Sequence, residues 1–137
     1  MWWIYALLSA FFAALTAIFA KIGIKGVDTD LATAIRTVVI LLLAWAIAIF
    51  RGGANSIGGL NKMNWIFLVL SGCATGFSWI CYFKALQLGE VSQVAPVDKL
   101  SVAIAIILAV IFLGEPLTLK TGVGALLIIG GSLVLIL

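Results

Sequence analysis

The sequence has no histidine and few charged residues, and both shortages limit what the chain can do. Only 9% of the 137 residues are charged, whereas soluble domains carry roughly 25%. Without histidine, the sequence argues against a zinc site or a histidine-based catalytic site. The two cysteines, Cys73 and Cys81, lie in one apolar run, about 12 Å apart along a helix, too far for a disulfide. We therefore expect no enzyme activity, no metal and no cofactor.

Apolar residues make up 65% of the chain, more than so few charges could keep dissolved in water. We therefore expect lipid to cover most of the surface. The net charge of +3 does not indicate a nucleic-acid partner. The eight Lys and Arg residues are spread over helix ends and two helix interiors and form no single basic face.

Five apolar runs are each long enough to cross a bilayer, which takes about 20 residues. Each must be a helix, because backbone polar groups in lipid have to be satisfied within the segment. We expect the first run to be a retained helix rather than a secretory signal, since no Lys or Arg precedes it. The sequence predicts an all-α integral membrane protein, one domain over residues 1–137, with helices at about 2–21, 31–50, 65–83, 91–113 and 119–137.

The positive charges are divided evenly between the two sides of the membrane. Near the helix ends, Arg51, Lys62 and Lys120 lie on one side, and Lys21, Lys25 and Lys84 lie on the other. The difference between the two sides orients a membrane protein, and here it is close to zero. The sequence therefore permits both orientations, although one orientation fixed by other signals stays open.

Three charged residues fall inside the predicted spans, where charge is costly and often functional. They are Arg36 in the second helix and Asp98 and Lys99 in the fourth. Both helices start on the same side, so we expect all three residues at a similar depth, about 8–12 Å in. They predict either a structural ion pair of Asp98 with Arg36 or Lys99, or a gate or substrate anchor.

The third helix carries a stripe of polar residues at spacings of four, three and four, which is one helical face. Its members are Ser71, Thr75, Ser78 and Tyr82, and Trp79 lies beside them. Two small residues, Gly72 and Gly76, allow a neighbouring helix to approach. The stripe either lines a cavity or bonds neighbouring helices.

Local signals mark the helix ends and one weak point. Asp28, Thr29 and Asp30 are candidate caps of the second helix, Ser92 of the fourth and Thr118 of the fifth. A kink at Pro96, beside Asp98, stays open. The last helix, 119–137, has small faces formed by Gly122, Gly124, Gly130, Gly131 and Ser132, which favour tight packing between protomers.

Taken together, several short motifs resemble the EamA-type members of the drug/metabolite transporter superfamily. They are Phe19-Ala-Lys21, Ala34-Ile-Arg36-Thr37, Phe83-Lys-Ala-Leu-Gln-Leu-Gly89, Pro96-Val-Asp-Lys-Leu-Ser101, Phe112-Leu-Gly-Glu115 and the glycine-rich last helix. The resemblance implies two five-helix halves of inverted topology around a cavity in the typical member. This chain resembles one half, so the resemblance implies completion by dimerisation.

We therefore expect a secondary transporter that moves a small metabolite or drug-like solute by alternating access. The even charge distribution fits an antiparallel homodimer, and inverted repeats around a central site are usual in such transporters. The resemblance implies a multi-pass protein of the cell (plasma) membrane of a prokaryote, in contact with lipid. Two alternatives stay open, a non-transporting subunit or partner half of a heteromeric transporter, and a flippase for lipid-linked sugars.

Overall fold

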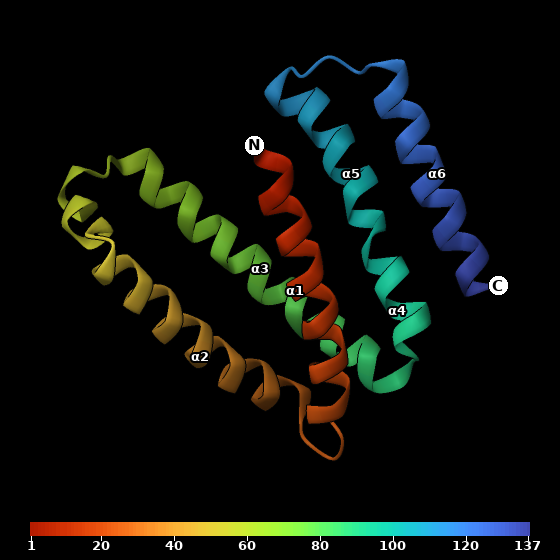
Figure 1. Cartoon of the computed structure of the whole chain (residues 1–137), viewed down its shortest axis with the longest axis horizontal. Coiled ribbons are helices and arrows are strands. Elements are labelled where there is room, and N and C mark those ends of the chain that lie inside the picture. The colour runs from red at the N-terminus through yellow and green to blue at the C-terminus, as the bar shows by residue number, and fades with distance from the viewer. The chain divides into compact units, whose positions relative to one another are not determined.

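A computed structural model describes all 137 residues, and every regular element in it is a helix (Figure 1). Five segments are long and apolar enough to cross a membrane, as the sequence predicts: α1, α2, α3, residues 91–113 and α6. The elements are α1 (Trp2–Gly23), α2 (Thr29–Phe50), η1 (Gly53–Gly59), α3 (Lys62–Leu88), α4 (Val91–Asp98), α5 (Leu100–Leu108), η2 (Ala109–Leu113) and α6 (Leu119–Ile136).

The chain forms two compact units. Unit 1 comprises Met1–Phe19 and Leu88–Leu137, and unit 2 comprises Ala20–Gln87. Unit 2 thus holds the end of α1 together with α2, η1 and α3, while unit 1 holds most of α1 with α4, α5 and α6.

Unit 2 has a small core at the end where α1 stops, α2 starts and α3 stops. Ile24, Phe83 and Leu86 are buried there, and the last two are completely inaccessible. Two side chains stabilise the same end by donating hydrogen bonds to backbone carbonyls. The Lys21 ammonium donates to the carbonyl of Leu86, and the Gln87 amide donates to that of Val27 at 2.9 Å.

α2 starts at Thr29, two residues before the predicted bound, and Asp28 is the one of the three predicted candidates that caps it. The bounds of α3 are also wider than predicted. The Asp28 carboxylate accepts from the backbone N–H groups of Asp30 and Leu31, both at 3.0 Å, and so caps α2. α3 extends beyond its apolar run, 65–83, at both ends, because polar residues there continue the helical hydrogen bonding. The predicted bounds of the third helix were therefore too narrow.

In unit 1 the fourth span is broken at Lys99, between α4 and α5. Pro96 has no N–H to donate to the preceding turn, and the N–H of Lys99 bonds to the Pro96 carbonyl only three residues back, at 3.1 Å. The same carbonyl accepts from the buried hydroxyl of Ser132 in α6 at 2.9 Å. The Pro96 carbonyl thus accepts two hydrogen bonds, one from its own segment and one from a side chain on the neighbouring helix α6.

The predicted cap of this span was wrong, whereas that of the next is confirmed. Glu90 precedes α4 without capping it, and the Ser92 hydroxyl bonds to the Glu90 carboxylate at 3.4 Å instead. Thr118 caps α6 by accepting from the N–H of Thr121. Between the two helices, Gly114 ends the wide η2 turn with φ of 66°, a left-handed conformation that favours glycine.

Replacing Ser132 with alanine should lower the stability of the protein by about 1 kcal/mol, because the Pro96 carbonyl loses a buried hydrogen bond. The measurement is thermal unfolding of the purified protein in detergent. Ser101→Ala is the control, since Ser101 is exposed on the adjoining helix α5. Equal melting temperatures for the two variants would show that the bond does not support the broken span.

Large apolar side chains are exposed along all five spans, and no span has more than 11% of its most apolar window buried. Leu42, Phe67 and Leu127, for example, are each more than half exposed. Such surfaces are unstable in water and suit lipid or another membrane helix. The burial pattern therefore agrees with a multi-pass membrane protein.

Candidate functional site

Arg36 lies about two turns into α2, roughly 10 Å from its start at 1.5 Å per residue. It shares one helix face with Thr29 and Thr33, at spacings of four and three. Both threonines are buried, and the Thr33 hydroxyl donates to the carbonyl of Thr29 at 2.8 Å. This face therefore points into unit 2, and it carries the Arg36 side chain inward.

Two aromatic rings of α3 hold the Arg36 guanidinium. Its central carbon lies 3.9 Å from the Trp79 ring centroid and 4.5 Å from that of Phe83. The two rings meet edge to face, with centroids 5.6 Å apart and planes at 85°. Each cation–π contact contributes about 0.5–2 kcal/mol, more where water is excluded. Together they offset part of the cost of placing a charge in a membrane span.

Tyr82 extends this aromatic group along α3. Its ring lies 6.2 Å from that of Phe83, with the planes tilted by 41°. Trp79 and Tyr82 are partly exposed, whereas Phe83 is fully buried beneath them. The two partly exposed rings are therefore the ones that a bound molecule could contact.

No carboxylate of unit 2 neutralises Arg36. The two carboxylates of this unit are Asp28, which caps α2, and Asp30 in the first turn of the same helix. Neither lies within ion-pair distance of the guanidinium, and its Nη1 is buried without a hydrogen-bond acceptor. Within unit 2, the Arg36 guanidinium is thus held against ring faces rather than by a carboxylate.

The other two predicted charges lie together at the break in the fourth span. The Lys99 ammonium is 3.1 Å from the Asp98 carboxylate, so these neighbours form an ion pair. Both side chains are partly accessible, at 56% for Lys99 and 35% for Asp98. They belong to unit 1, whereas Arg36 belongs to unit 2, so a cluster of all three charges stays a prediction.

Asp98→Asn should lower the free energy of unfolding by less than about 1 kcal/mol, because a partly exposed ion pair contributes little. If the pair is a gate, the same variant should lose solute transport. Thermal unfolding in detergent and uptake into proteoliposomes measure the two effects separately. A large loss of stability with normal transport would assign the pair a structural role, and no change in either would mean that Asp98 has neither role.

The polar stripe of α3 faces away from the core of unit 2. Ser71, Thr75 and Ser78 are exposed, and the Thr75 hydroxyl donates to the Ser71 carbonyl at 2.9 Å. Gly72 and Gly76 have open space where a side chain would stand. Whether this exposed face meets water, lipid or another chain stays a prediction.

Cysteine labelling along α3 tests the stripe. Single cysteines at positions 71–82, in a chain without Cys73 and Cys81, should react with a membrane-impermeant thiol reagent only at Ser71, Thr75, Ser78 and Tyr82. Reactivity should repeat every three to four residues, because only one face of the helix would meet water. Labelling at no position would show that the stripe bonds to neighbouring helices.

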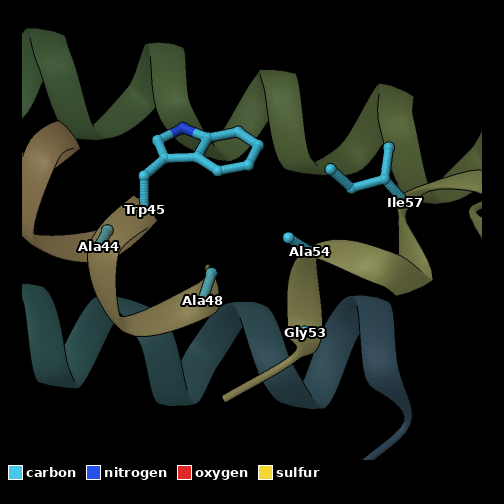
Figure 2. A pocket seen from close by; sticks show the side chains of 6 residues that line it. All are labelled: Ala44, Trp45, Ala48, Gly53, Ala54 and Ile57. Atoms are coloured by element: carbon cyan, nitrogen blue, oxygen red, sulfur yellow. The ribbon is translucent and has the colours of Figure 1, made fainter. Parts of the chain in front are cut away.

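A pocket lies elsewhere in unit 2, where the end of α2 meets η1. It has a volume of about 230 Å³, and Figure 2 shows the Trp45 indole and the Ile57 side chain pointing toward it from the two elements. Its other lining residues are Ala44, Ala48, Gly53 and Ala54. Only the indole N–H offers a side-chain hydrogen bond here, so the pocket suits an apolar group better than a polar solute.

Metal chemistry finds no support in the side chains. No group of three or more His, Cys, Asp and Glu residues lies close enough to hold an ion.

The five apolar spans and the membrane-embedded charges agree with the comparison to known proteins. A protein family described as "EamA-like transporter family" matches residues 1–137, the whole chain. This chain belongs to the EamA-like transporter family. A relative from Sinorhizobium sp, described as "Uncharacterized transporter in cobO 3'region", is 49% identical over 134 residues, 98% of this chain and 95% of that protein. No solved structure matches the chain.

Membership of the EamA family, together with the description of the relative, indicates a membrane transporter. The structure adds one residue to those singled out from the sequence. Phe83 was not among the predicted site residues, yet it forms the second wall around the Arg36 guanidinium. Its spacing of four from Trp79 places both rings on one helix face, and that signal was present in the sequence.

Proposed function

We propose that this EamA protein is a secondary transporter that moves a small metabolite or drug-like solute by alternating access. The observation that carries the proposal is the family match over all of residues 1–137, together with five helical segments long and apolar enough to cross a membrane. The relative from Sinorhizobium, also described as a transporter, supports it. A bacterial plasma membrane is the corresponding location.

The working unit in this proposal is an antiparallel homodimer, in which two copies supply the two inverted halves around one pathway. The even distribution of positive charge permits both orientations. Small residues of α6 support a close contact between copies, because Gly122, Gly124, Gly130 and Gly131 have open space where a side chain would stand. Nothing within the chain requires their small size, whereas a partner helix would.

In this proposal Arg36, Trp79 and Tyr82 contact the solute from unit 2. Asp98 and Lys99 lie at an interruption of a span, and interrupted helices are where such transporters place their binding and gating groups. The exposed hydroxyls of Ser71, Thr75 and Ser78 supply hydrogen bonds along the pathway. When substrate binds, Asp98 or Lys99 would leave their ion pair for another partner, and this exchange would open and close the pathway.

Reconstitution tests the proposal directly. Purified protein in liposomes should take up one or a few compounds from a mixture of bacterial metabolites, measured by mass spectrometry of the lumen against protein-free liposomes. The mass of the detergent-solubilised protein should correspond to two chains. A monomer that accumulates nothing would favour a subunit of a heteromeric transporter, and movement of labelled lipid-linked sugar without soluble solutes would favour a flippase.

A further inference from the structure

We propose that Arg36 binds a carboxylate group of the transported solute, so that the substrates of this protein are small organic monoanions. The inference rests on the proposed transport function, because it names the substrate class for the same site. It follows from how the guanidinium is held, from which carboxylates are available to it, and from the number of charges at the site.

The way in which the guanidinium is held leaves one of its donor nitrogens, Nη1, without an acceptor. Trp79 and Phe83 attract the charge through their ring faces, at 3.9 and 4.5 Å from the central carbon. A ring face offers no carboxylate-like lone pairs, and arginine carries five N–H donors. Nη1 is buried without an acceptor. An unsatisfied buried donor destabilises the protein, and more so when it is charged, so an added acceptor would bind favourably.

Four carboxylates of the chain either bond to another group or lie at an exposed helix start. In unit 2, Asp28 caps α2 and Asp30 lies in its exposed first turn, where the helix dipole favours it. In unit 1, Glu90 bonds to the Ser92 hydroxyl and Asp98 pairs with Lys99. The anion that complements Arg36 is therefore best supplied by the solute.

The shape and charge of the site favour a carboxylate over other anions. The planar fork of a guanidinium matches two carboxylate oxygens in a bidentate pair. One arginine neutralises one negative charge, whereas a phosphate dianion would leave an unpaired charge in a medium of low dielectric, which is costly. The partly exposed rings of Trp79 and Tyr82 lie beside the guanidinium and suit the apolar part of such a solute.

Acetate is the simplest probe, because it presents the carboxylate alone. In the purified full chain, replacing Trp2, Trp3, Trp45 and Trp65 with phenylalanine leaves Trp79 as the one tryptophan. Sodium acetate, titrated against sodium chloride at constant ionic strength in an uncharged detergent, should change the Trp79 emission with saturation. Neutral acetamide should not. The melting temperature of the unsubstituted protein with and without acetate provides a second measurement, should the four replacements disturb folding.

Variants of Arg36 decide whether the response belongs to this site. Arg36→Gln should abolish it, and Arg36→Lys should weaken binding at least tenfold, since lysine has no planar fork. Arg51→Gln is the matched control, because Arg51 is an exposed arginine at the other end of α2, and it should respond fully.

Several results would overturn the proposal. One is the absence of a saturable response in both measurements. Another is an unchanged response in Arg36→Gln, and a third is tighter binding of inorganic phosphate than of acetate. A response to added phosphatidylglycerol but not to acetate would assign Arg36 to lipid headgroups instead. Acetate binding by a protein that transports nothing would contradict only the proposed function, and transport confined to uncharged solutes would contradict only the assignment of Arg36.

Discussion

Replacing Phe83 with alanine is expected to lower the free energy of unfolding by about 3–5 kcal/mol, as for other fully buried phenylalanines. Phe83 has no accessible surface and lies in the small core of unit 2 beside Leu86. The substitution would leave a cavity there and would also remove one of the two rings around the Arg36 guanidinium. Thermal or denaturant unfolding in detergent measures the loss.

A second phenylalanine on the same helix provides the control. Phe77 is 72% exposed on α3, so Phe77→Ala should change stability by less than about 0.5 kcal/mol. Phe83→Leu keeps most of the volume and should fall between the two, while still removing the ring. If Phe83→Ala and Phe77→Ala unfold alike, the core of unit 2 does not depend on Phe83.

The second large effect concerns orientation in the membrane. A reporter fused to the C-terminus should be found on both sides, because the positive charges near the helix ends are evenly divided. Two added lysines should then select one orientation. Asn55→Lys with Ser56→Lys adds them to the exposed η1 segment, and a Lys-Lys extension after Leu137 adds them to the opposite side.

In these variants, transport activity should depend on whether both orientations are present in the membrane. Each locked form alone should be inactive, since an antiparallel dimer needs both orientations, and co-expression of the two should restore uptake. The two forms carry similar charge and differ only in where it lies, so each controls for the other. A single orientation of the unaltered protein, or full activity of either locked form alone, would contradict the antiparallel homodimer.

The helices of this protein were predictable from sequence because each is set by local chemistry. An apolar run in lipid has few choices other than helix, and Asp28 and Thr118 cap their helices through their own side chains. The aromatic and charged candidates Arg36 and Trp79 were also identifiable, since charge and large rings stand out in an apolar chain. Their contact at 3.9 Å supports grouping these two.

Features that depend on contacts between helices were not predictable in the same way. A proline near the break at Lys99 was visible in the sequence, but the second donor to the Pro96 carbonyl is the hydroxyl of Ser132, 36 residues later in the chain. Ser92 has the chemistry of a cap, yet a nearby carboxylate, Glu90, offers its hydroxyl a competing partner. The spacing of Phe83 from Trp79 places both rings on one helix face, but only the position of Arg36 in space shows that both rings contact the guanidinium.

The placement of the unit 2 core has a mechanical consequence. Ile24, Phe83 and Leu86 join the helices at the end where α2 begins, and α2 then continues for 22 residues, or about 33 Å. A helix anchored near one end acts as a lever. A tilt of about 5° around this core would displace the far end of α2 by about 3 Å, given that length. Arg36, one third of the way along, would move by only about 1 Å, so the guanidinium would stay close to its aromatic rings while the far end of the helix moves.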